Sequence, residues 1–380
     1  MKRMSLLIVA AGVLLLSSAC VPTAQPGQAS IVVSGGIHSC AVLGDQTVRC
    51  WGNNGYGQLG NGTVTDSTVP VVATGVTGVT VIAAGEHHTC VVAPPSVSCW
   101  GRNDSGQLGN GTVIGSSPAV SVGGLLGITA LAAGRAHTCG LVGNNGPGAV
   151  WCWGAGSSGQ LGNDLYTPSS VPVAVSGLTD AIAIGAGADT TCAVRSTRTV
   201  VCWGDNTSGK LGNGSNVLKI GVPSPVSGLT DAVDVSPGYR HTCSHTTTGL
   251  LWCWGDESIG QLGNGVAVPS AFSNVPIAVA IPLVALVSSG SDFTCATLAL
   301  QGVNCWGRND LGQIGDGSTT PRTVPTAPGI NGVVTTSAGD GHVCVRTNTS
   351  NVRCWGWNGF GQLGDGTTTN RLTSVEVTGL

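Results

Sequence analysis

The tripeptide Cys-Trp-Gly occurs seven times in this chain of 380 residues, and consecutive copies are 49 to 53 residues apart. A second cysteine precedes each copy, and a segment of the form Gly-Gln-Leu-Gly-Asn-Gly follows it. Such a period indicates one structural unit repeated seven times, which overrides the two or three domains that length alone would suggest.

The second unit shows how the repeat folds. Short apolar or β-branched runs at 79–83, 89–92 and 97–100 (strands A, B and C) are separated by turn residues, and a long loop leads to a fourth run, strand D, at 120–122. One such sheet cannot bury both faces alone, so the units must pack against one another. Radial packing predicts an all-β fold, a seven-bladed β-propeller of four-stranded antiparallel blades. The alternative, a β-helix, has coils shorter than 50 residues.

The N-terminus predicts export. A short positive region is followed by an apolar stretch from Ser5 to Leu16, which is too short to span a bilayer, and small residues then lead to Cys20. This resembles the signal of bacterial lipoproteins, so we expect lipidation of Cys20, secretion across the inner membrane, and a lipoprotein of the outer membrane or cell surface. Ordinary cleavage near Ala19, leaving a free thiol, is the alternative.

The expected organisation is a signal peptide (1–19), a lipidated cysteine and flexible tether (20–30) and the propeller (31–380). The repeats are expected at about 31–78, 79–127, 128–180, 181–231, 232–282, 283–332 and 333–380.

The pattern A-x-G-x-x-H-T-C-A-V, followed by V-x-C-W-G-x-N-x-x-G-Q-L-G-x-G, resembles the regulator of chromosome condensation repeat. The resemblance covers about 31–380 and implies that family's seven-bladed propeller. Family members include nucleotide-exchange factors for a small GTPase, chromatin binders and a secreted inhibitor of β-lactamases. This chain has a signal sequence and no basic tail, so we take the fold from the resemblance and not the exchange activity.

Fourteen of the fifteen cysteines lie in the repeats, two in each, and Cys20 is left over. Within a unit they lie on the adjacent strands B and C, where cross-strand Cβ atoms are near disulfide reach, and an exported protein permits disulfides. The predicted pairs are Cys40–Cys50, Cys90–Cys99, Cys139–Cys152, Cys192–Cys202, Cys243–Cys253, Cys295–Cys305 and Cys344–Cys354.

A zinc site is the alternative, because a histidine stands two residues before the first cysteine in five units (His38, His88, His137, His241 and His342). Thr190 and Phe293 replace it in the other two, although both cysteines remain. The cysteines therefore need each other rather than the histidine, and we expect no metal and no cofactor.

Other motifs favour structure over chemistry. The seven tryptophans of Cys-Trp-Gly could stack on sugars, but their place on strand C favours burial. The Gly-Gln-Leu-Gly loop leads to a strand rather than to a helix, which argues against a nucleotide site. No catalytic set breaks the repeat, and the charged groups Asp256-Glu257 and Glu86-His87-His88 read as solvated loops. We therefore expect no enzyme.

Charge argues against nucleic acid as a partner. The chain has 15 basic and 18 acidic residues, a formal net charge of −3, and it lacks a basic run. Removal of Lys2 and Arg3 with the signal leaves 13 against 18, or −5. Tight binding of nucleic acid needs clustered Lys and Arg.

Variation within the repeat predicts a binding surface. In a four-stranded meander the A–B and C–D loops lie at one end of the blade, and these loops vary while the framework stays fixed. From A–B loops come Glu86, His87, Arg135, Asp189, Tyr239, Arg240, Asp292 and Asp340. From C–D loops come Arg102, Asp205, Asp256, Glu257, Arg308 and Trp357.

The expected function is that of a monomeric scaffold tethered to the envelope, which binds an unidentified protein through this end and contacts the membrane only through its lipid. Inhibition of a secreted enzyme, suggested by the β-lactamase inhibitor, and carbohydrate binding or processing are the alternatives.

Overall fold

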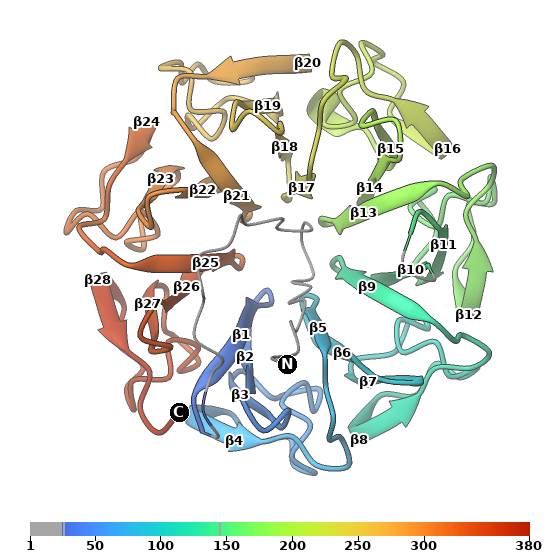
Figure 1. Ribbon diagram of the computed structural model, residues 1–380, viewed down its shortest axis with the longest axis vertical. Coiled ribbons are helices and arrows are strands. Elements are labelled where there is room, and N and C mark those ends of the chain that lie inside the picture. The colour runs from blue at the N-terminus through green and yellow to red at the C-terminus, as the bar shows by residue number, and fades with distance from the viewer. Residues whose placement is uncertain (1–24, 26, 144–145) are drawn as a thin grey trace, which may run out of the picture.

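Seven four-stranded antiparallel sheets surround a central axis in the computed structural model, which describes residue 25, residues 27–143 and residues 146–380 (Figure 1). This confirms the predicted seven-bladed, all-β propeller. Cys20 and the expected signal peptide lie outside the described residues. Among those residues, no helix is long and apolar enough to cross a membrane.

Each blade takes four consecutive strands, A to D, from the axis outward. The A strands are β1 (Ala29–Ser34), β5 (Val81–Ala84), β9 (Ile128–Ala133), β13 (Ala181–Ala186), β17 (Ser236–Pro237), β21 (Val284–Ser289) and β25 (Val333–Ala338). The B strands are β2 (His38–Leu43), β6 (His88–Ala93), β10 (His137–Val142), β14 (Thr190–Arg195), β18 (His241–His245), β22 (Phe293–Leu298) and β26 (His342–Thr347).

The C strands are β3 (Val48–Gly52), β7 (Ser96–Gly101), β11 (Ala149–Gly154), β15 (Val200–Asp205), β19 (Leu251–Asp256), β23 (Val303–Gly307) and β27 (Val352–Gly356). The D strands are β4 (Ser67–Val72), β8 (Ser116–Ser121), β12 (Ser169–Ala174), β16 (Lys219–Pro225), β20 (Phe272–Val279), β24 (Arg322–Thr326) and β28 (Arg371–Glu376). A short 3-10 helix, η1 (Thr207–Gly209), lies in the fourth C–D loop.

The D strand of the second blade begins earlier than expected, at Ser116 rather than at residue 120. This outer strand pairs on one side only and contains Pro118, which an edge strand tolerates. Its residues are half-buried or exposed, so it lacks the apolar pattern that marks the inner strands.

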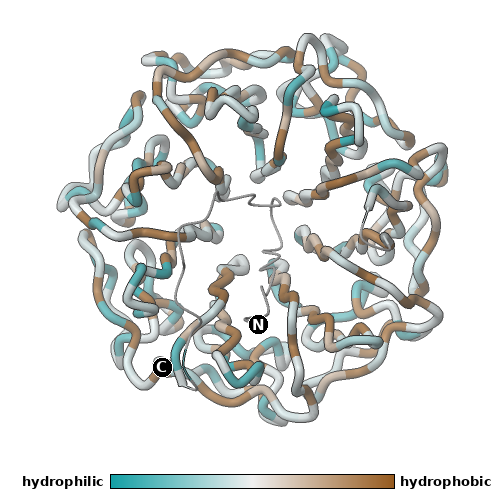
Figure 2. Tube along the Cα trace, in the orientation of Figure 1, coloured by the Kyte–Doolittle hydropathy of each residue, from teal (hydrophilic) through white to brown (hydrophobic). Residues whose placement is uncertain are grey.

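The hydrophobic core lies between blades rather than within them. One cluster joins Cys40 and Val42 of the first blade to Ile82 and Trp100 of the second, and the other seams have equivalent clusters. Figure 2 shows hydrophobic residues along most of the inner strands. All seven tryptophans of Cys-Trp-Gly are fully buried, as expected of core residues.

The Gly-Gln-Leu-Gly loop binds the next blade through a backbone carbonyl. The oxygen of Gln58 accepts hydrogen bonds from Thr89 Oγ1 (3.0 Å) and Trp100 Nε1 (2.8 Å). Gly60 has a φ of +70°, and a Cβ atom there would lie 2.7 Å from Trp100 Nε1. The glycines of this loop therefore serve the blade seam, which explains why the motif recurs without phosphate-binding chemistry.

Seven disulfides join strands B and C, one in each blade, and they are the pairs that the repeat predicts. The nearby histidine bonds to the next blade: His38 Nε2 lies 2.8 Å from Thr89 Oγ1. Because the Thr89 hydroxyl donates to Gln58, it accepts from His38, so Nε2 carries a proton. Burial lowers the pKa of His38 to about 3, which keeps the ring neutral. These histidines are seam residues.

The ring closes without exchange of strands. Ser39 Oγ lies 2.8 Å from His342 Nε2, and Trp51 Nε1 donates to Gln362 O at 2.9 Å, so the seam between the last and first blades repeats the chemistry of the others. Arg49 also donates to the carbonyl of Gly379 at 3.1 Å. The end of the chain therefore lies against the first blade, as a closed ring requires.

Candidate binding rim

The A–B and C–D loops of all seven blades meet at one end of the propeller, and we call these loops the rim. A backbone bond joins the two loops in each blade, as from Asn53 N to Ile37 O (3.0 Å) and from Arg308 N to Asp292 O (2.9 Å). The predicted binding residues therefore lie on one face, on a backbone that repeats from blade to blade.

Seven glycines bring the A–B loops together around the axis: Gly35, Gly85, Gly134, Gly187, Gly238, Gly290 and Gly339. A Cβ atom on any of them would lie within 2.2–2.7 Å of the next glycine's carbonyl oxygen, and Gly339 approaches Gly35 so that the circle is complete. We call this the glycine ring. It surrounds the mouth of an open cavity of about 90 Å³.

The residue after each ring glycine also lines the cavity. These residues are Gly36, Glu86, Arg135, Ala188, Tyr239, Ser291 and Asp340. The repeat therefore fixes seven equivalent positions at the mouth and fills them with different side chains.

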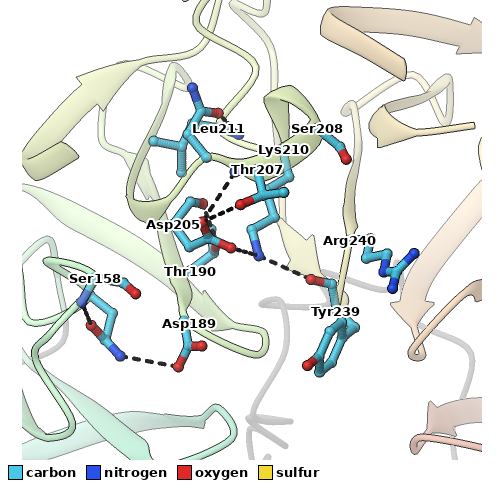
Figure 3. A network of polar contacts seen from close by, with 12 residues as sticks. Ser158, Asp189, Thr190, Asp205, Thr207, Ser208, Lys210, Leu211, Tyr239 and Arg240 are labelled. Atoms are coloured by element: carbon cyan, nitrogen blue, oxygen red, sulfur yellow. Dashed lines mark hydrogen bonds and ion pairs between the residues drawn. The ribbon is translucent and has the colours of Figure 1, made fainter. Parts of the chain in front are cut away.

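A polar network ties the third, fourth and fifth blades together (Figure 3). Lys210 replaces the glutamine of Gly-Gln-Leu-Gly, is buried, and contacts Asp205 Oδ2 (2.7 Å) while donating to Tyr239 O (3.0 Å). Burial alone would raise the pKa of Asp205, but the ammonium of Lys210 and the hydrogen bonds of Thr207 lower it. Asp205 is thus an internal partner as well as a rim residue.

Other rim charges are paired within the protein. Arg135 contacts Asp189 at 2.6 Å, and Gln160 donates to the other oxygen of that carboxylate at 3.1 Å. Arg240 and Arg308 both lie 3.9 Å from Asp292. Burial raises the pKa of Asp189 and Asp292, although the arginines oppose it.

The expectation of solvated loops at Asp256-Glu257 and Glu86-His87-His88 is wrong for several of these residues. Asp256 is 7% exposed and accepts bonds from Ser258 N (2.9 Å) and Gln261 Nε2 (2.7 Å). Glu257 is 8% exposed and binds Asn264, and His88 is fully buried in a seam. These polar groups hold the loop together, so two of the predicted partner-binding residues, Asp256 and Glu257, are structural.

Sequence reasoning missed four large side chains on the rim. The residue before Gly-Gln-Leu-Gly is serine in the second, third and fourth blades, but it is Ile259, Leu311, Phe360 and Tyr56 in the others. Tyr56 is exposed, and its ring lies 5.0 Å from that of His87 and 5.1 Å from the guanidinium of Arg102. The signal was the change from serine to bulky residues at a position that the repeat pattern leaves variable.

Trp357 and Phe360 form a second aromatic contact, with ring centroids 5.5 Å apart. Trp357 and Leu311 both lie close to Gly341, where a Cβ atom would be 3.2 Å from Trp357 Cβ and 3.7 Å from Leu311 Cδ1. The rim is therefore asymmetric, because both of these aromatic contacts lie in the seventh, first and second blades.

Asp340 differs from the other rim carboxylates. Its hydrogen-bond donor is Ser291 Oγ at 3.4 Å, and burial, with the charge of Glu86, raises its pKa to about 6. The described residues contain no cluster of three His, Cys, Asp or Glu side chains placed to hold a metal ion.

Comparison with known proteins agrees with this architecture. Residues 96–380 match the RCC1-like domain, and residues 47–92 and 30–58 match the regulator of chromosome condensation (RCC1) repeat. The chain belongs to the RCC1-like domain family.

The ultraviolet-B receptor UVR8 of Arabidopsis thaliana is 30% identical to this RCC1-like protein over 304 residues, which are 78% of this chain and 69% of the receptor. Human WBSCR16 has a similar structure (TM-score 0.75, 21% identity), covering 84% of this chain and 87% of its own. So has Prp20p of Saccharomyces cerevisiae (TM-score 0.76, 17% identity), covering 92% and 87%. At these identities the two structures establish the fold.

Proposed function

We propose that this protein is an extracytoplasmic scaffold, tethered to the cell envelope through Cys20, that binds a protein partner through its rim. It is a binding protein rather than an enzyme. The observation that carries the proposal is the contrast at the rim: one repeated set of backbone bonds presents a different side chain from each blade. Rigid scaffolds commonly present recognition residues on loops in this way.

The disulfides support a location outside the cytoplasm. All fourteen repeat cysteines are paired and fully buried. Disulfides persist in oxidising compartments and are rare in the reducing cytosol. Export is also what the N-terminal signal predicts.

The end of the propeller at which β1 begins supports an orientation in which a tethered protein would face its rim away from the membrane. In β1, Ala29 pairs with Leu43 at the B–C end, and Gly44 N donates to Gln28 O at 2.8 Å. The chain thus enters the propeller at the end opposite the rim. A lipid at Cys20 would hold that end toward the membrane and leave the rim facing away from it.

A relative supports protein binding as a use of this fold. Prp20p, which shares the propeller, has binding properties toward Gsp1p and histones. Nothing about those partners transfers to this chain, whose charge is negative.

The anchor is tested by membrane fractionation of the Cys20→Ala variant. The wild-type protein should fractionate with membranes and the variant should be soluble. A soluble wild-type protein would refute the tether but would not bear on the proposal that the rim binds a partner.

The rim is tested by capture from envelope extracts, followed by identification of the bound proteins. Replacing Tyr239, Arg240 and Trp357 by alanine should abolish capture, because Trp, Tyr and Arg are the side chains that most often dominate an interface. The matched control replaces Asp45, Leu250 and Leu300, which are exposed at the opposite end, and should capture the same protein. The opposite result would assign binding to the other face.

A further inference from the structure

Two carboxylates converge over Gly36 at the cavity mouth. A Cβ atom on Gly36 would lie 2.9 Å from Asp340 Oδ2 and 2.9 Å from Glu86 Cγ. Glu86 comes from the second blade and Asp340 from the seventh, so the acidic pair (Glu86 and Asp340) closes over the first blade from both sides. A side chain at residue 36 would push the two apart.

The acidic pair has no ion pair with a Lys or Arg within the part of the chain that the structure describes. Burial alone would raise the pKa of Glu86, but His87 and, from a greater distance, Arg135 and Arg102 lower it. Glu86 contacts His87 at 3.3 Å, and Asp340 accepts a bond from Ser291, but neither has a Lys or Arg within 4 Å. Several other carboxylates of the rim do have such a partner: Arg135 for Asp189, Lys210 for Asp205, Arg240 and Arg308 for Asp292, Arg102 for Asp104, and Arg308 for Asp310. Asp256 and Glu257 lack one, but amide side chains of their own loop bind them and they do not line the cavity. Among the carboxylates that line the cavity, the acidic pair is therefore where an added cation gains most.

Apolar side chains flank the acidic pair on both sides. Next to Asp340, Gly341 lies close to both Leu311 and Trp357, and Trp357 contacts Phe360. Next to Glu86, His87 contacts Tyr56. We call Leu311, Trp357, Phe360 and Tyr56 the apolar arc. It spans the sixth, seventh and first blades.

We propose that this side of the rim binds a protein segment in which a lysine or arginine stands next to a large apolar side chain. The cation enters the open cavity between Glu86 and Asp340, and the apolar neighbour packs on the apolar arc. This inference rests on the proposed function and specifies the chemistry of the partner.

The acidic pair complements the basic side chain of such a segment, and the apolar arc complements its apolar side chain. A basic side chain exchanges its water for two carboxylates that lack a Lys or Arg partner, and such charge-assisted bonds are the stronger kind. Leu311, Trp357, Phe360 and Tyr56 supply the aromatic and aliphatic area that interface centres favour. An acidic segment would meet repulsion at the same place.

The test is a bead library of seven-residue peptides, randomised at the three central positions and incubated with the purified, folded propeller. Bound beads should be enriched in Lys or Arg adjacent to Trp, Phe, Leu or Tyr. In a selected peptide, replacing the basic residue by norleucine, which keeps the chain and removes the charge, should weaken binding by about tenfold or more.

Two variants of the protein separate the acidic pair from the apolar arc. The double variant Glu86→Gln with Asp340→Asn should select peptides that are still enriched in apolar residues but no longer in basic ones. The double variant Phe360→Ser with Tyr56→Ser introduces the serine of other blades and should select peptides that are enriched in basic residues but no longer in apolar ones. The matched control, Asp104→Asn, removes a rim carboxylate that is paired with Arg102 and should select as the wild type does.

Each other outcome overturns the proposal in a distinguishable way. Enrichment in acidic or uncharged peptides that still depends on Tyr239, Arg240 and Trp357 would refute the cationic partner and leave the rim as the binding face. Basic peptides that bind the Glu86 and Asp340 variant unchanged would place the cation elsewhere. Failure to select any peptide, or selection unaffected by every rim substitution, would refute both the inference and the proposed function.

Discussion

Phe293 and Val343 pack together in the seam between the sixth and seventh blades, at the two positions that hydrogen-bond in five other seams. In those five seams the first is a histidine and the second a threonine or serine, whereas Thr190 takes the first position in the seam between the fourth and fifth blades. The polar pair is thus exchanged as a unit for an apolar pair of similar size. This relationship explains why the histidine could be missing from a repeat without loss of the cysteines.

The buried histidines should make the propeller sensitive to acid. Burial lowers the pKa of His38, His88, His137 and His342 to about 3, and that of His241 to about 4. In the unfolded chain these rings take up a proton near pH 6.5, so the stability that they contribute is complete above that pH and is lost as the pH falls toward 3. Each buried ring lowers the free energy of unfolding by about 1.4 kcal/mol for every pH unit that the pH falls in this range.

The double variant His38→Phe with Thr89→Val copies the pair that the sixth seam already has. In urea unfolding between pH 4 and 6, the free energy of unfolding of the variant should fall less steeply with decreasing pH than that of the wild type. The difference in slope should equal the contribution of one histidine. An unchanged slope would mean that His38 is not held neutral by burial.

The glycine ring predicts sharp intolerance of a methyl group. In Gly134→Ala the new Cβ would lie 2.2 Å from the carbonyl oxygen of Gly187 and 2.3 Å from His137 Cε1. We expect a loss of about 1–3 kcal/mol in the free energy of unfolding, as for other overpacked sites. Gly146→Ala, where the added carbon meets nothing within 4 Å, is the control and should be nearly neutral in thermal unfolding.

The framework could be predicted from the repeat because each unit contains the residues that determine its own strands and its own disulfide. Cys90 and Cys99 stand on neighbouring strands whatever the other blades do, and Trp100 is buried because the same position is apolar seven times. The number of blades follows from the number of copies. These features depend on residues within one unit or on its nearest neighbour.

The rim was harder to predict because its chemistry crosses seams. Lys210 reaches the carbonyl of Tyr239 in the next blade, and Asp189 pairs with Arg135 of the preceding one. Such contacts depend on how two loops face each other, which the sequence of either loop does not state. Asp256 looked like a solvated charge because its burial depends on how its own loop folds over it and on Ser208 of the preceding blade, which donates to it at 3.4 Å.

The disulfides should resist reductant in the folded protein, because every bonded sulfur is inaccessible to solvent. Dithiothreitol added without denaturant should leave all seven intact, whereas the same treatment in denaturant should reduce them.

Removal of one disulfide, as in the double variant Cys139→Ser with Cys152→Ser, should lower the free energy of unfolding by about 2–3 kcal/mol, since the bond closes a short loop. Peptide mapping without reduction is the check, and pairs between different blades would contradict the assignment.

Lys210 should tolerate the residue that the other blades use. Lys210→Gln keeps a donor toward Asp205, as Gln261 has toward Asp256, and should change stability by less than about 1 kcal/mol. Lys210→Met fills the space but leaves Asp205 without its cation, and should cost about 2–4 kcal/mol. Because Lys210 lowers the pKa of Asp205, the stability from the ion pair is present above the ordinary pKa of aspartate and is lost as the pH falls through the lowered value. The cost should therefore shrink below about pH 4, which urea unfolding at neutral and at acidic pH would show. An equal loss in both variants would refute the ion pair.

Asp340 should weaken the folded state at neutral pH. Burial raises its pKa to about 6, so folding favours the protonated acid, and this advantage is present below the ordinary pKa of aspartate and is lost as the pH rises through 6. Asp340→Asn should therefore stabilise the protein at pH 8, by up to about 3 kcal/mol, and change little at pH 4. Equal effects at both pH values in chemical denaturation would argue against the raised pKa.

The seam between the seventh and first blades uses the same bonds as the other seams, and each blade is one continuous stretch of chain. The position of the termini is therefore a matter of gene order rather than of architecture. A gene cut at another junction between blades, with the old ends joined, would encode seven intact blades and the same number of equivalent seams. A fold of this kind can begin its sequence at any blade and can gain or lose a whole blade by copying or deleting a single segment of about 50 codons.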